Sequence, residues 1–114
     1  MVLLLSCLLL AATAQANTVR IFNLNAENWA RPRSGEVLPL MEPVRLAVSY
    51  WDSLDNAAIV LSYPGEDSGE LWAAELKDWL ISLGIPSDYI YLSPGLQISG
   101  EIRILVGHTE ELEI

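Results

Sequence analysis

"AAIVLSYPGEDSGELWAAELKDWLISLGIPSDYIYLS", residues 57–93, is the stretch that decides the fold. It opens with Ala57–Tyr63, a nearly continuous apolar run that is typical of a central strand buried on both faces. Bulky apolar residues then recur at helical spacing, which predicts a helix over Gly69–Leu83. An alternating segment, Tyr89–Ser93, predicts a second strand. We therefore expect a strand, a helix and a strand at the centre of the fold.

The two ends of the predicted helix carry turn and capping residues. Pro64 and the glycine after it end the preceding strand. Asp67 is expected to accept hydrogen bonds from the free N–H groups of the first turn, while Glu70 reaches back, as in a capping box. Gly84 suits the left-handed residue that follows many helices, and Pro86 prevents continuation.

The flanking segments complete a simple order of elements. Thr18–Asn25 predicts a strand that is apolar on both sides, and Ala26–Glu36 is expected to be a loop. Met41–Leu54 has apolar residues at helical spacing, and Glu101–Gly107 alternates as a strand. The acidic tail, residues 108–114, has little pattern. Strand, helix, strand, helix, strand, strand predicts an α/β (α+β) two-layer sandwich, with one domain over residues 17–107.

The first sixteen residues, "MVLLLSCLLLAATAQA", are expected to be a secretory signal peptide. They are apolar, too short to span a membrane, and end in the small-x-small pattern Ala14-Gln15-Ala16. No basic residue precedes the apolar run, so we hypothesise that the true start lies upstream of Met1. Cys7 is the single cysteine, and lipidation there is an alternative because it faintly resembles a lipoprotein site. The expected location is the periplasm or the exterior.

The net charge of the chain limits the classes of partner that it can bind. Fifteen acidic and six basic residues give a formal net charge of −9. Nucleic acids and anionic lipid surfaces are poor partners for such a chain, because binding phosphate requires clustered Lys and Arg. After removal of the leader the chain has no cysteine, so a disulfide and a thiol nucleophile are excluded for the mature chain.

The segment "DWLISLGIPSDYIYLSPG", Asp78–Gly95, resembles the region after the second helix in the OmpA-like family. That family comprises the peptidoglycan-binding domains of outer-membrane protein A and flagellar stator proteins. "VRIFNLNAE" is similar to its opening strand, "AAIVLSY" stands where its second strand would, and "EIRILV" is similar to its closing strand. The resemblance covers most of Val19–Val106 in order of elements, and implies the family's fold.

The chain departs from the family at the ligand residues. Family members carry an aspartate just after the second strand and an arginine that meets the diaminopimelate carboxylate of the cell wall. Counting back from the Gly-Ile-Pro match places Trp72 at the arginine position and Pro64 nearest to the aspartate position. An indole cannot replace the two charge-assisted bonds of a guanidinium group. We therefore expect no peptidoglycan binding by the usual route.

Catalytic and metal chemistry find little support in the residues. His108 is the single histidine, and only Glu110 and Glu111 lie close to it in sequence. Zinc is excluded, since one histidine without cysteines cannot supply three or four ligands. The acids of "GEDSGE", residues 65–70, suit helix capping better than a calcium loop. No serine stands in a G-x-S-x-G elbow. We predict no enzyme activity, no cofactor and no metal.

The tryptophans divide into two groups. Trp51, Trp72 and Trp79 stand at helix-stripe positions and are expected to belong to the core. Trp29 lies in a loop with Arg31 and Arg33, which makes these three the candidate binding residues for a sugar, a carboxylate or a partner strand. Alternatively, Trp29 covers the sheet edge and the arginines balance the acidity.

These observations predict a small exported, non-enzymatic protein, an accessory or adaptor of a bacterial envelope assembly. Its partner is expected to be an envelope protein, bound through the "NWARPR" loop, residues 28–33, or through an exposed sheet edge. The alternative is a variant peptidoglycan or muropeptide binder that uses Trp29, Arg31 and Arg33.

Overall fold

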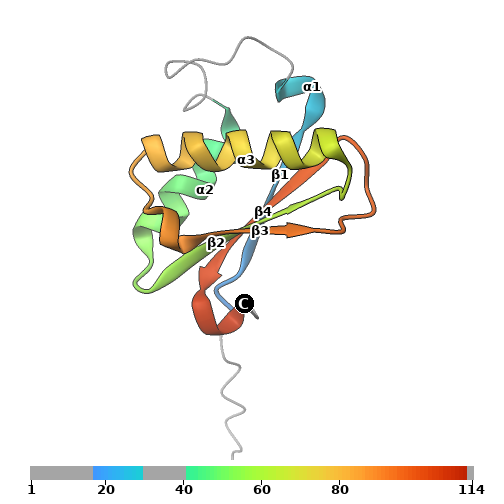
Figure 1. Ribbon diagram of the computed structural model, residues 1–114. Coiled ribbons are helices and arrows are strands. Elements are labelled where there is room, and N and C mark those ends of the chain that lie inside the picture. Colours follow the sequence, from blue (N-terminus) through green and yellow to red (C-terminus); the bar gives the residue numbers. More distant parts are fainter. Residues whose placement is uncertain (1–16, 30–40, 113–114) are drawn as a thin grey trace, which may run out of the picture.

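The computed structural model describes residues 17–29 and 41–112, without the side chains of Asn28 and Trp29. These residues form a four-stranded sheet with two long helices packed on it (Figure 1). The predicted mixed α/β two-layer sandwich is thus confirmed. The predicted leader, residues 1–16, lies outside the described residues.

The elements follow the predicted order with three short additions. The strands and main helices are β1 (Arg20–Asn25), α2 (Glu42–Ser53), β2 (Ala57–Tyr63), α3 (Asp67–Ser82), β3 (Ile90–Pro94) and β4 (Glu101–His108). The start of the predicted loop instead forms a short helix, α1 (Ala26–Trp29). The acidic tail, which has little sequence pattern, contains the 3₁₀ helix η3 (Thr109–Glu111). A second 3₁₀ helix, η2 (Ser87–Tyr89), precedes β3.

The sheet has the order β1-β4-β2-β3. β4 runs antiparallel to both of its neighbours, whereas β2 and β3 are parallel and are joined by the crossover through α3. The register places Ile104 opposite Phe22 on one side and opposite Leu61 on the other. Since side chains of opposed residues share a face, this register assigns every strand residue to one of the two faces.

One face of the sheet carries the core. Both α2 and α3 pack on this face. Their buried residues form a single cluster with strand residues that all point to the same side of the sheet. The strands contribute Leu24, Ile59, Leu61, Tyr63, Ile90, Ile102, Ile104 and Val106, and the helices contribute Val44, Ala47, Ala73, Leu76 and Leu80. This is the core face.

The C-terminal end of α3 has the predicted glycine stop. Gly84 has a φ of 105°, a left-handed conformation that favours glycine. Its N–H donates to Ile81 O at 3.0 Å, while the N–H of Ile85 donates to Leu80 O at 3.2 Å. These two bonds form a Schellman motif, and the buried Ile85 and Leu80 provide its apolar contact.

The N-terminal end of α3 differs from the prediction. The N-cap is Glu66, and no side chain caps the helix, so the predicted capping box of Asp67 and Glu70 is wrong. Both acids still lie in the first turn, where the helix dipole favours negative charge. Gly69 allows the tight approach of the preceding loop, because a Cβ there would lie 2.3 Å from the Pro64 carbonyl oxygen.

Candidate functional site

The second face of the sheet, which we call the open face, is not covered by α2 or α3. A line of apolar side chains crosses it from one edge strand to the other. The register places Ile21 beside Leu105, Leu105 beside Val60, and Val60 beside Tyr91. Ile21 is 54% exposed and Tyr91 is 38% exposed, while Leu105 and Val60 are half-buried even though their strands are central. We call these four residues the apolar row.

Polar side chains lie on one side of the apolar row. Asn23, Arg103, Ser62 and Ser93 occupy the next register positions across the four strands. Arg103 Nε lies 3.9 Å from Glu101 Oε2, a long contact between charges of opposite sign. The open face therefore changes from apolar to hydrogen-bonding character along its strands.

Small residues lie on the other side of the apolar row. Ala58 is opposite Gly107 in the register. A Cβ on Gly107 would lie 2.9 Å from the Cα of Val19, which shows that the chain before β1 packs directly on this glycine. This end of the open face therefore has only small side chains, and the N-terminal segment of the domain partly covers it.

The predicted binding residues Trp29, Arg31 and Arg33 are only partly within the described residues. Trp29 is the last residue of α1, which follows edge strand β1, but its side chain is not described. Arg31 and Arg33 lie outside the described residues. Their role as a binding loop stays a prediction.

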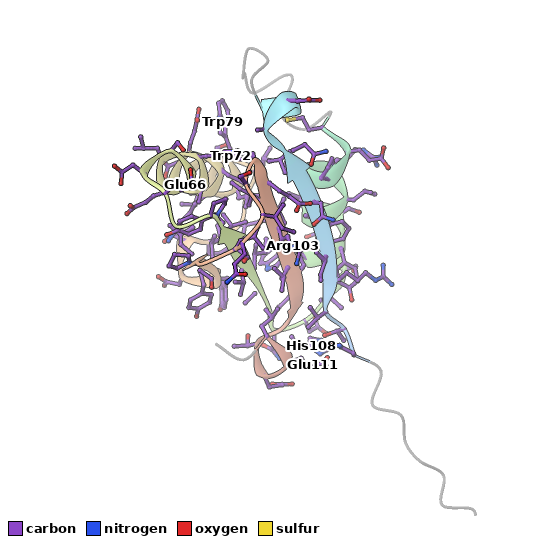
Figure 2. The ribbon with its side chains drawn as sticks, turned by 90° about the vertical axis from the view of Figure 1, so that its right-hand side faces the viewer. Glu66, Trp72, Trp79, Arg103, His108 and Glu111 are labelled. Carbon is purple, nitrogen blue, oxygen red and sulfur yellow. The ribbon has the colours of Figure 1, made fainter. Side chains whose placement is uncertain are left out.

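The other three tryptophans contact the core, as predicted. Trp51, Trp72 and Trp79 are half-buried and pack against the core cluster from the two helices. The resemblance to the OmpA-like family predicts Trp72 at that family's arginine position and Pro64, which is buried, nearest to its aspartate position. Figure 2 shows Trp72 and Trp79 beside α3, well apart from Arg103 on β4.

His108 lies in a cluster that joins the two ends of the domain. The backbone N–H of Thr18 donates to Glu111 Oε2 at 2.7 Å, and the N–H of His108 donates to Thr18 Oγ1 at 2.9 Å. The Tyr50 hydroxyl donates to the Thr18 carbonyl. His108 Nδ1 lies 3.6 Å from Glu111 Oε1, and Figure 2 shows the two side chains together. The Glu111 carboxylate, which lies beside the His108 imidazole, accepts the hydrogen bond from Thr18 and so links the N-terminal and C-terminal segments of the domain. We therefore assign this cluster a structural role.

A hollow of about 450 Å³ opens between the C-terminal parts of α2 and α3. Its lining consists of Arg45, Val48, Ser49, Trp51, Asp52, Leu83, Gly84 and Ile85. The indole N–H of Trp51 donates to Ala57 O at 3.2 Å, so this group is already used within the fold. The hollow offers an apolar wall with one charge of each sign.

Two other kinds of site, a metal centre and a membrane-spanning helix, are absent from the described part of the chain. No group of three or more His, Cys, Asp or Glu side chains there is placed to hold a metal ion. None of the helices in residues 17–29 and 41–112 is long and apolar enough to cross a membrane. Comparison with known protein families and with curated proteins finds no match to this chain.

The open face is the feature that sequence reasoning missed. The alternation of "EIRILVG" in β4 assigns Leu105 to the side opposite the core, where Arg103 is also found. A leucine at an outward position of a central strand is the signal that could have pointed to this face. The strand β1 was predicted to be apolar on both sides, and Ile21, on the side away from the core, has no covering layer among the described residues.

Proposed function

We propose that this chain is a small exported, non-enzymatic binding protein, an accessory or adaptor in an assembly of the bacterial envelope. Export is supported by the leader-like composition of residues 1–16. The order of elements and the Gly84-Ile85-Pro86 segment support a divergent relationship to the OmpA-like family. The binding surface that we assign is the open face.

The observation that carries this proposal is the exposed apolar row. A small sheet normally buries its apolar side chains against a second layer, and single exposed apolar residues need no explanation. Here four apolar residues are contiguous across all four strands. A contiguous apolar patch with a polar border is the usual mark of a protein interaction site.

Site-specific photocrosslinking in the native envelope tests this proposal. A photoreactive residue replaces Ile21 on the open face or, as a matched control, Leu71, which is 73% exposed on α3. We expect a covalent product with another envelope protein from position 21 and none from position 71. No product at position 21, or equal products at both positions, would refute the assigned surface. A product that contains only a second copy of this chain would keep the assigned surface but remove the adaptor role.

A further inference from the structure

The charges of the strands show which surface two copies of this acidic chain can share. The exposed acids of the main helices are Glu42, Asp52, Asp67, Glu70 and Asp78. On the open face, by contrast, the strands present one acid, Glu101, and one base, Arg103, which lie together. The open face is therefore neutral in a chain of net charge −9. Two such chains repel each other through their helices, but not through this face.

The direction of the apolar row favours a second sheet as its cover. The β4 residues on the open face are, in order, Glu101, Arg103, Leu105 and Gly107. Only one of them, Leu105, is a large apolar residue. A helix presents its apolar stripe along its own axis, and would have to cross all four strands to cover the row. A second four-stranded sheet has the same width and a matching row.

We infer that the open face binds a second copy of the same chain, face to face, as a two-sheet sandwich. This inference rests on the proposed function, because it concerns the surface assigned there, and a pair that exchanges readily leaves that surface accessible to another envelope protein. The sheet order places β4 and β2 in the centre, so a two-fold axis along the strands between them exchanges β4 with β2 and β1 with β3. Such an interface is self-complementary, as two-fold symmetry requires.

This arrangement matches side chains without opposing like charges. Leu105 packs on Val60 of the second copy, and Ile21 packs on Tyr91 of the second copy. Arg103 meets Ser62 of the second copy, so the two guanidinium groups do not face one another. Ala58 and Gly107 make no contact across the interface, because Ala58 is fully buried and the segment before β1 packs on Gly107. Two aligned sheets pack about 10 Å apart, a layer that side chains of these sizes fill.

The size of the face predicts a weak dimer. Four strands at about 4.8 Å spacing are about 19 Å wide, and the seven residues of β2 are about 23 Å long. The area buried by both copies is then about 900 Å², below the roughly 1,200–2,000 Å² of stable interfaces. The dissociation constant is expected in the micromolar range, and the assembly exchanges readily.

Sedimentation equilibrium of residues 17–114, from low micromolar to several hundred micromolar, tests the inference. We expect a monomer–dimer equilibrium that Ile21→Glu and, independently, Tyr91→Glu weaken at least tenfold. Leu71→Glu, which adds the same charge on α3, is expected to weaken it by less than twofold. Circular dichroism confirms that each variant is folded. A wild type that stays monomeric throughout, or equal effects of all three variants, would overturn the inference.

Cysteine crosslinking tests the symmetry of the pair. The mature chain has no cysteine, since the single one, Cys7, lies in the predicted leader. The double variant Ile21→Cys/Tyr91→Cys, treated with a short bis-maleimide, is expected to give a crosslinked dimer. Each single variant is expected to stay uncrosslinked, because its two copies lie at opposite edges. A crosslinked dimer from Ile21→Cys alone would overturn this arrangement. If the protein stays monomeric in both experiments, the self-association is refuted. The photocrosslinking test of the adaptor role is independent of that result.

Discussion

The two faces of this sheet are built from alternate residues of the same strands and serve different ends. On the core face, Ile104 is fully buried under the helices, whereas its neighbour Leu105 is half-buried on the open face. The helices bury as much of the sheet as the domain needs for a core, and they leave the second apolar surface exposed. This difference is the basis of our proposal that stability depends on one face and association on the other.

The largest effect is expected from a matched pair on β4. Ile104→Ala removes a fully buried side chain and is expected to lower the free energy of unfolding by about 3 kcal/mol. Leu105→Ala, on the open face, is expected to lower it by about 1 kcal/mol at dilute concentration. Urea denaturation measures both values. Equal losses would show that a second layer covers the open face within one chain.

A smaller loss in the free energy of unfolding is expected at the end of the open face that has small side chains, where the N-terminal segment crosses it. Gly107→Ala places a Cβ 2.9 Å from the Val19 Cα, so the segment has to shift. We expect a loss of about 2 kcal/mol in the free energy of unfolding, measured in urea. Gly65→Ala is the control, because its nearest neighbour would lie 3.8 Å away. A harmless Gly107→Ala would show that Val19 does not pack there.

The cluster that joins the ends of the domain is expected to contribute less. Glu111→Ala leaves the part-buried N–H of Thr18 without its carboxylate acceptor, which is expected to cost about 1 kcal/mol. Faster amide hydrogen exchange at Thr18 is the specific readout. Glu110→Ala removes the exposed neighbouring acid and serves as the control. Unchanged exchange at Thr18 would contradict the hydrogen bond.

The smallest effect is expected for cell-wall binding. Because the resemblance to the OmpA-like family predicts Trp72 at that family's arginine position, the wild type is expected not to sediment with purified sacculi. Arg31→Ala/Arg33→Ala is then expected to change nothing. Sedimentation of the wild type that is lost in this double variant would support the alternative prediction, a peptidoglycan or muropeptide binder that uses the Trp29 loop.

The fold was predictable wherever local chemistry and periodicity agree. The bounds of β2 match the expected apolar run, and the left-handed Gly84 ends α3 as expected. The capping box was wrong because Asp67 became the first helical residue instead of the cap. η3 was missed because its support is tertiary, through the bond between Glu111 and Thr18.

The candidate site was less predictable than the fold. An alternating strand tells which residues share a face, and not whether a helix covers that face. The alternation of β3 and β4 is enough to place Tyr91 and Leu105 on the side opposite the buried residues of their strands. Their alignment with Ile21 depends on the sheet order β1-β4-β2-β3, which no local pattern specifies. The apolar row therefore emerges only when four distant segments are paired.

Methyl NMR of residues 17–114 over a concentration series tests the central claim most directly. If the open face binds a second copy, the methyl signals of Ile21, Val60 and Leu105 are expected to shift together as concentration rises. Those of Ile59 and Ile104 on the core face, and of Leu71 on α3, are expected to stay in place. Open-face signals that do not move with concentration, or shifts of the same size on α3, would contradict the account.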